Sequence, residues 1–485
     1  MHWPELVRLV LLGTDRSATA IEGRPEDQIL EMLGRTALQS KAGWEPLQWN
    51  GALPEPAPET TEIVCPPKAA QFLDILLDKG YAALLPEYLQ ALQKHNWILP
   101  PERIPELLNR CQAQPGLWEQ LAPGLGLTGQ WIAAQHPAWN QWHITVDDLH
   151  WEQATHEQHC RYLKHLHQLD PVGAVSTIEA VWQESPLRYR VDFLKTLSPP
   201  GHPAVYNLLE SLLQDKRKEI RQTAAGLLRQ AKGSPLQQRL FDHLLQWISW
   251  HPQGPEIKMA LPSTLPATFE KDGFTISDTN LFLRQAIAAI PPDWWADAWE
   301  AEPFSVLAAF GKHSDELADA LLEAVLNNPA GIWIEAMGAF WMEHNSSFSP
   351  EKIKMLIPLL PSAFVTDQCS KSLLNREIPL AEDHPVAQLI RESNHPWDKR
   401  LSLIFVRHVQ RWMQQSSQFK WNTWHYQQLM RSAALRADPS IVREIQEGWP
   451  TGTGSWYQWK GEVELLLSLL AFRKQMLDAL TPKGS

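Results

Sequence analysis

Residues Asp215 to Leu228 read DKRKEIRQTAAGLL, and this stretch decides the fold expected for the chain. Apolar residues recur at helical spacing at Ile220, Ala224 and Leu228, and most of the positions around them are charged or polar. A helix with one apolar stripe cannot bury that stripe alone, so it must lie against neighbouring helices. The stretch therefore predicts one helix within a stack.

Similar helices are predicted on both sides of this stretch. Apolar residues from Val205 to Leu213 form a stripe before it. After it, Ser234-Pro235 supplies a helix cap followed by a first-turn proline, and apolar residues repeat every four positions from Leu236 to Ile248. Several striped helices in a row predict an all-α fold in which stacked neighbours build the core.

The same stretch resembles the second helix of a HEAT-type repeat. The resemblance rests on Asp215, on Ile220-Arg221, on Ala224 and on Leu228. In such a helix Asp215 would cap the first turn and pair with an arginine of an adjoining repeat. Ala224 would allow close helix approach, and Leu228 would fill the core. We therefore expect an α-solenoid of HEAT-like helical hairpins.

The chain divides into four regions by composition. Residues 1–135 form an N-terminal helical region with a Pro-rich loop over 43–67, and residues 136–250 hold the HEAT-like repeats. Prolines and a Lys271-Asp272-Gly273-Phe274 turn mark residues 251–280, where we expect a small irregular or β insertion near 252–280 that pairs Glu256–Leu261 with Phe274–Ile276. Residues 281–485 form a C-terminal helical region.

Helical periodicity in the last region predicts several helices and ends with one that docks on the body. The expected ranges are Leu281–Ile290, Pro292–Trp299, Ser314–Asn327, Ile332–Glu343, Pro350–Leu359, Trp397–Gln415, Ile441–Glu447 and Gly461–Leu480.

Composition limits the class of protein and of partner. The 485 residues carry a net charge of −12, which disfavours nucleic acid as the main partner. The four cysteines are far apart and suit a reducing compartment. The first residues make a poor signal peptide and no apolar run is long enough to span a membrane, so we expect a cytoplasmic protein.

Two motifs invite a chemical interpretation that their details do not support. His156, His159 and Cys160 share one face of a predicted helix, but the spacing is not HExxH and a fourth zinc ligand is missing. Gly124 to Gly129 has GxGxxG spacing, but no predicted strand precedes it. We therefore assign no catalytic residue, no metal ligand and no cofactor.

The 24 tryptophans supply candidate partner-binding residues. Trp294 and Trp295 follow a Pro-Pro pair, and Trp456 and Trp459 follow the glycine-containing loop Thr451–Gly454. Exposed tryptophans often anchor a partner, while buried ones fill gaps between thin helical layers. Arg16 is a fifth candidate, because it follows the first predicted helix and can bond an acidic partner or the helix carbonyls.

Most of the chain resembles one bacterial family of uncharacterised helical-repeat proteins. The resemblance is carried by residues 11–16, 185–188, 271–274, 282–295 and 315–326. Members are encoded beside a MoxR-type AAA ATPase, a von Willebrand factor A (VWA) domain protein and a SWIM zinc-finger protein. The resemblance implies a non-catalytic scaffold or adaptor whose protein partner is an AAA ATPase or a VWA-domain protein.

Two other functions remain open at this point. The first is an enzyme on a HEAT-like body, such as a DNA-base glycosylase or a tetrapyrrole lyase. A glycosylase would need a basic groove that contains an acidic residue and aromatic side chains. The second is a zinc-dependent module centred on His156 to Cys160.

Overall fold

The computed structural model describes residues 25–42, 55–59, 61–78, 81–114, 116–140, 151, 154–251, 256–375, 380, 382–415, 423–453 and 456–482. Its contacts divide the chain into two units, residues 1–56 and 57–485. In the first unit, helix α2 (Pro25–Ala42) begins with a proline, a residue that suits the first turn of a helix. Ile29 is buried on this helix, whereas Leu30 and Leu38 are exposed.

The second unit begins with short helices. These are α3 (Pro67–Asp78), α4 (Leu85–Lys94), α5 (Ile104–Ala113), α6 (Leu117–Leu121), α7 (Gly126–Gln135) and α8 (Pro137–Asn140). Two short strands, β1 (Ile63–Val64) and β2 (Trp97–Ile98), pair in parallel. This pairing was not predicted, since β1 lies within the expected Pro-rich loop. Residues 43–54 of that loop lie outside the described residues.

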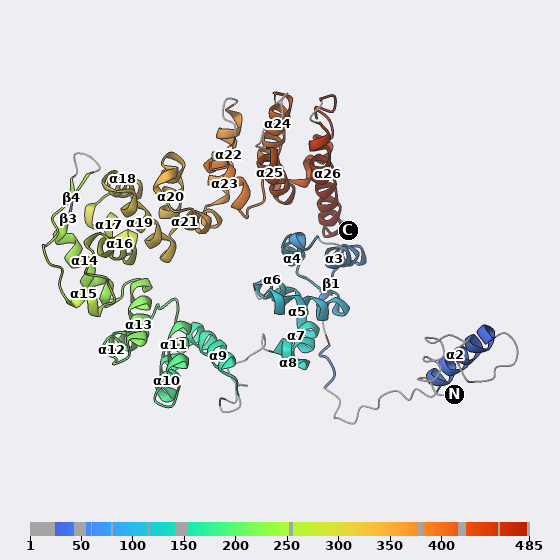
Figure 1. Cartoon of the computed structure of the whole chain (residues 1–485), viewed down its shortest axis with the longest axis horizontal. Helices are drawn as coiled ribbons and strands as arrows, with labels where there is room; N and C mark the ends of the chain where they lie inside the picture. Colours follow the sequence, from blue (N-terminus) through green and yellow to red (C-terminus); the bar gives the residue numbers. More distant parts are fainter. Residues whose placement is uncertain are drawn as a thin grey trace. The chain divides into compact units, whose positions relative to one another are not determined.

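The repeat region folds as consecutive helices that contact one another. They are α9 (His156–Leu169), α10 (Pro171–Val181), α11 (Leu187–Thr196), α12 (Pro203–Leu212), α13 (Lys218–Gln230) and α14 (Pro235–Trp247) (Figure 1). Each helix touches its neighbour or the helix two places along: α9 contacts α11, α11 contacts α13, and α10 contacts α12. This alternation buries the apolar stripes in a common core.

The expected insertion contains a β hairpin, but its strands differ from the prediction. Helix α14 ends at Trp247, and β3 (Ile248–His251) pairs antiparallel with β4 (Glu256–Met259). Phe274 to Ile276 belong to no strand. The four-residue spacing had placed Ile248 in the helix, but at this position the chain turns into an extended strand whose first residue is buried.

Helices resume after a short helix, α15 (Thr268–Lys271). They are α16 (Thr279–Ala289), α17 (Pro292–Trp299), α18 (Pro303–His313), α19 (Asp315–Asn327), α20 (Gly331–Glu343), α21 (Pro350–Leu356), α22 (Ser362–Leu374), α23 (Pro385–Glu392), α24 (Lys399–Gln415), α25 (Thr423–Arg436) and α26 (Trp456–Ala479). The sequence had not predicted α18, α22, α23 or α25. The helix expected over Ile441–Glu447 is a 3-10 segment, Pro439–Arg443.

Helix α26 docks on the body, as predicted. It contacts α25 and also α3 and α4, the first helices of the same unit. Phe472 stacks on Tyr81 at 4.8 Å between ring centres and meets Phe72 edge-on at 5.3 Å. The two ends of residues 57–485 therefore share a core. None of the described helices is long and apolar enough to cross a membrane.

Candidate binding groove along helix α13

Helix α13 has one buried face and one polar face. Ile220, Ala224 and Leu228 are fully buried between neighbouring helices. The other side presents residues at helical spacing that line cavities: Glu219, Gln222, Thr223, Gly226 and Gln230. The amphipathic pattern that fixes the helix in the stack thus also exposes a strip of polar groups.

Three cavities lie along this strip, and α13 contributes to each of them. We call them the amide, basic and α11 cavities, with volumes of about 270, 360 and 830 Å³. The amide cavity is lined by α13, α16 and α19, the basic cavity by α13 and residues 270–277, and the α11 cavity by α11 and α13. Gln222 lines both the basic and the α11 cavity. The basic and α11 cavities therefore adjoin, the amide cavity lies further along the same helix, and we call the three together the groove.

The amide cavity is rich in groups that both donate and accept hydrogen bonds. Gln230, Gln285 and Asn327 bring side-chain amides from three different helices. The Gln285 side-chain oxygen accepts from the Thr275 amide at 2.9 Å, which fixes its position. Gly226 adds open space, because a Cβ atom there would meet only the end of Arg229 at 4.0 Å.

Arg229 stands between the amide cavity and the basic cavity. Its Nη1 donates to the Gly273 carbonyl at 3.2 Å, and its guanidinium carbon lies 5.3 Å from the ring centre of Phe274. Burial lowers the pKa of Arg229, and the carboxylate of Glu323 opposes that effect. Arg229 is therefore held in place by the fold, and its contact with Gly273 ties α13 to the turn beside it.

The basic cavity gathers three cations. Lys218 and Arg221 come from the first turns of α13, and Lys271 comes from the end of α15. Glu270 is the one carboxylate in its lining. Gly273 shapes the cavity, because its φ of +83° suits glycine and a Cβ atom there would lie 2.9 Å from that of Ala225. The predicted Lys271–Phe274 turn is thus present, and close packing against Ala225 explains why a glycine occupies it.

The α11 cavity is closer to neutral. Asp192 receives hydrogen bonds from His156 Nε2 at 3.1 Å and from Lys195 at 3.3 Å. Burial raises the pKa of Asp192, but these bonds outweigh burial and hold its pKa below the usual value. His156 also stacks on Tyr189 at 3.7 Å between ring centres. Asp192 therefore stays ionised but already has partners.

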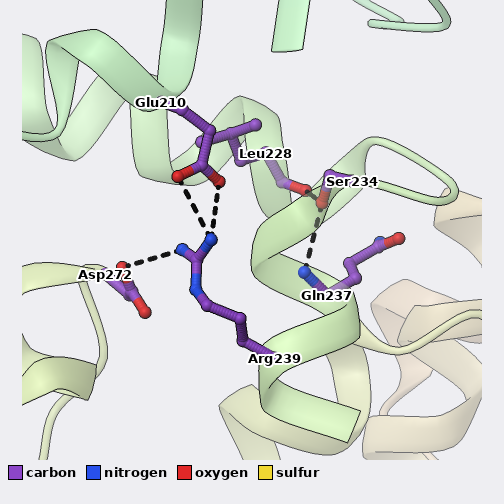
Figure 2. Close-up of polar contacts among 6 residues, drawn as sticks. All are labelled: Glu210, Leu228, Ser234, Gln237, Arg239 and Asp272. Carbon is purple, nitrogen blue, oxygen red and sulfur yellow. Dashed lines mark hydrogen bonds and ion pairs between the residues drawn. The ribbon is translucent and has the colours of Figure 1, made fainter. Parts of the chain in front are cut away.

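A polar network joins α12 and α14 to the turn beside the basic cavity (Figure 2). Arg239 of α14 bonds Glu210 of α12 at 3.2 Å and reaches Asp272 beside the turn at 3.4 Å. The buried Gln237 side chain donates to the carbonyls of Arg229 and Ala289, both at 2.8 Å. These contacts position α13, α16 and the 270–277 segment relative to one another.

Asp215 and Arg221 lie differently from the HEAT-based expectation. Arg217, not Asp215, occupies the N-cap position of α13. The Asp215 carboxylate accepts from the Arg217 amide at 2.7 Å, and Arg221 donates to the Asp215 carbonyl at 2.7 Å. Both contacts stay within one loop and helix, so the expected pairing between adjoining repeats is replaced by a local one.

The tryptophan candidates contribute mainly to packing. Trp295 is fully buried, with its ring 5.0 Å from Phe241 and 5.3 Å from Phe310. Trp459 is 3% exposed and meets Trp412 edge-on. Trp294 and Trp456 are partly buried and retain some surface. Partner contact through Trp294 or Trp456 stays a prediction, and Arg16 lies outside the described residues.

The residues considered for chemistry have structural contacts. His159 bonds the Trp151 carbonyl at 2.8 Å and stacks on that ring, while Cys160 lies 3.7 Å from His156. Among the described residues, no three His, Cys, Asp or Glu side chains are grouped to hold a metal ion. At Gly129 a Cβ atom would lie 2.8 Å from Ile104, so this glycine permits close packing.

Arg221 and Lys271 were named from the sequence for the repeat pattern and for the turn, but none of the groove residues was predicted to line a binding site. Gln230, Gln285 and Asn327 come from three helices and meet only in the fold. One local signal was present, since Gly226 interrupts a segment whose other residues favour a helix.

Comparison with known proteins identifies a family without an assigned activity. DUF5691, described as a family of unknown function, matches residues 5–480. No curated protein and no solved structure gives a significant match to the chain.

Proposed function

We propose that this chain, which belongs to the DUF5691 family, is a non-catalytic scaffold or adaptor that holds a partner protein in the groove along α13. The observation that carries the proposal is the polar face of α13, which contributes residues to three cavities along the helix. A long polar groove offers many weak contacts along its length, which suits an extended polypeptide.

The contacts between alternate helices support an α-solenoid of HEAT-like hairpins as the finer architecture. In such a fold each helical pair touches only its neighbours, and one helical layer presents a continuous binding face. Helices α11, α13, α16 and α19, together with the 270–277 segment, would form that layer here. The groove then lies where solenoid proteins commonly bind their partners.

The chemistry of the groove suits a peptide backbone. A side-chain amide presents one acceptor and two donor hydrogens, and an extended peptide presents alternating carbonyl and N–H groups. Gln222, Gln230 and Asn327 are exposed to the groove. Gly226 leaves room for the backbone of a partner to approach the helix closely. Binding of this kind requires no catalytic group.

The glycosylase alternative gains less from these observations. The groove contains cations, but Asp192, Glu219, Glu270 and Glu323 are distributed among them. Its aromatic residue, Phe274, is 3% exposed and lies beneath Arg229, so it offers no face on which a base could stack. No feature of the groove specifically supports a tetrapyrrole lyase.

The partner is proposed from the family resemblance. The resemblance implies that such proteins are encoded beside a MoxR-type AAA ATPase and a VWA-domain protein, so we propose one of these two as the occupant of the groove. A scaffold would bring the ATPase and its accessory protein together through separate surfaces.

The test uses the purified full chain and, as candidate partners, a purified MoxR-type AAA ATPase and a purified VWA-domain protein from the same organism. Isothermal titration calorimetry measures binding of each to the natural chain, to Gly226→Leu and to Gly461→Leu. Gly461 is a matched control, because it also lies within a long helix and a Cβ atom there meets nothing within 4 Å. Circular dichroism and the melting temperature check that both variants fold.

We expect one of the two partners to bind with a micromolar or lower Kd, and Gly226→Leu to weaken that binding at least about tenfold by filling the amide cavity. Gly461→Leu should bind like the natural chain. Failure of both folded partners to bind, or equal binding by Gly226→Leu, would overturn the proposal.

A further inference from the structure

We propose that the basic cavity binds a carboxylate side chain of an acidic, extended segment of the partner protein. This inference rests on the proposed function and adds the chemistry of the segment that is recognised. It follows from the charges, the size and the surroundings of this one cavity.

The charges of the cavity are not neutralised within the fold. Lys218 and Lys271 are exposed, and within the part of the chain that the structure describes neither forms an ion pair. Arg221 uses one nitrogen on the Asp215 carbonyl, which orients the guanidinium and leaves other donors free. Three cations therefore face one carboxylate, Glu270, in a protein whose net charge is −12. An acidic group is the complementary ligand.

The size of the cavity favours one side chain with its backbone. A volume of about 360 Å³ lies at the small end of the range for ligand sites, roughly 300–1,000 Å³. Gln222, Thr275 and Ser277 add polar groups to its wall. The cation cluster supplies the charge-assisted bonds, and these neutral groups supply hydrogen bonds to the adjoining peptide backbone.

The surroundings favour a peptide over a nucleic acid. A nucleic-acid backbone carries one charge at every phosphate, so its site needs cations along the whole track. Here Glu219 follows Lys218 directly and lines the α11 cavity, and Glu323 lines the amide cavity. A segment with one or a few acidic residues avoids these carboxylates, whereas a phosphate chain would meet them.

The test measures fluorescence anisotropy of the full chain with fluorescein-labelled peptides of about eleven residues at about 0.15 M salt. One peptide alternates Glu with Ala, Ser and Gly; a second carries Gln and a third carries Lys at the Glu positions. An oligothymidylate of equal charge is the fourth probe. Lys218→Gln and Lys271→Gln remove one cation each. Lys216→Gln is the matched control, because Lys216 is exposed in the loop directly before α13 but does not line the cavity.

We expect the Glu peptide to bind at least about tenfold more tightly than the Gln peptide or the oligothymidylate. Lys218→Gln and Lys271→Gln should each weaken binding of the Glu peptide about three- to tenfold, and Lys216→Gln should not change it. The double variant Lys218→Glu with Lys271→Glu should prefer the Lys peptide.

Four outcomes would overturn the inference: no binding of the Glu peptide up to about 1 mM, equal binding of the Glu and Gln peptides, an equal loss with Lys216→Gln, or tighter binding of the oligothymidylate. These outcomes differ from a failure of the proposed function. If Gly226→Leu abolishes partner binding while Lys218→Gln and Lys271→Gln leave it intact, the groove binds a partner but the acidic anchor is wrong.

Discussion

Arg473 and Glu87 form a two-point ion pair although 386 residues separate them in the chain. The Arg473 Nε donates to one carboxylate oxygen at 2.8 Å, and Nη2 donates to the other at 2.7 Å. Nη1 donates to the carbonyls of Ala434 and Ala437 at 2.9 and 2.7 Å. The Arg473 side chain is 2% exposed. One buried guanidinium thus joins α26 and the end of α25 to α4.

Replacing Arg473 with Met should cost about 3–5 kcal/mol of unfolding free energy. The change leaves the Glu87 carboxylate partly buried without its cation and removes donors from two buried carbonyls. Urea denaturation followed by circular dichroism measures the loss. Arg284→Met is the control, because Arg284 pairs with Glu316 between α16 and α19 and the two side chains are 46% and 62% exposed. It should cost less than about 1 kcal/mol. Equal losses in the two variants would contradict the special role of Arg473.

Two glycines beside the groove should respond in opposite ways to alanine. Gly226→Ala should stabilise the protein by about 0.5–1 kcal/mol, because the position is mid-helix and a Cβ atom finds open space. Gly273→Ala should destabilise it by at least about 1–2 kcal/mol, because φ is positive and the new Cβ atom meets Ala225. Urea denaturation of both variants checks the signs. A loss of stability in Gly226→Ala would contradict the open space around a Cβ atom at this position.

Ser234→Ala should remove a hydroxyl that caps the start of α14 and also bonds a carbonyl near the end of α13. The fully buried Ser234 hydroxyl donates to the Leu228 carbonyl at 2.7 Å and accepts from the Gln237 amide at 3.2 Å (Figure 2). We expect a loss of about 1–2 kcal/mol, since the Gln237 amide is left without a partner and the Leu228 carbonyl keeps only its bond from the Ala231 amide at 3.3 Å. Ser468→Ala, which removes an exposed hydroxyl from α26, is the control. If the two changes cost the same, the Ser234 contacts do not stabilise the fold.

The sequence predicted the parts of the fold that depend on local pattern. Ser234-Pro235 marks the start of α14, Pro292–Trp299 matches α17, and the final striped helix docks as expected. Two of the missed helices, α22 and α25, have weak amphipathic patterns, whereas α23 has a strong one that was overlooked. In α22, for example, Cys369 takes the place of a large apolar residue between Val365 and Leu373.

Contacts between distant residues could not be predicted in the same way. The periodicity of the last helix placed leucines inward, but nothing in it indicated that Arg473 would be buried against Glu87. The same limit applies to the groove, because Gln230, Gln285 and Asn327 are ordinary polar residues in sequence and line one cavity only through helix stacking. Asp215 shows the reverse error, where a known motif suggested a long-range pairing and the fold uses a local one.

Asp272→Asn should stabilise the protein at neutral pH and flatten the pH dependence of its stability. Burial raises the pKa of Asp272; Arg239 opposes this, and Glu210 adds to it. The native carboxyl therefore holds its proton to a higher pH than the unfolded one, whose pKa is about 3.9. The stabilisation from that proton is complete below the unfolded pKa and is lost as the pH rises through the native pKa. The amide keeps the shape of the carboxyl without the buried charge.

Urea denaturation at several pH values from about 4 to 7 measures this difference. The advantage of Asp272→Asn over the natural chain should be smallest at the acidic end and should grow until the native pKa has been passed. Asp242→Asn controls for the loss of one surface carboxylate, because Asp242 is exposed on the same helix as Arg239. A variant that is less stable at every pH would show that the 3.4 Å contact between Arg239 and Asp272 outweighs the cost of burying the charge. In that case the turn that shapes the basic cavity is held by charge attraction, and Arg239→Met should loosen it to the same extent.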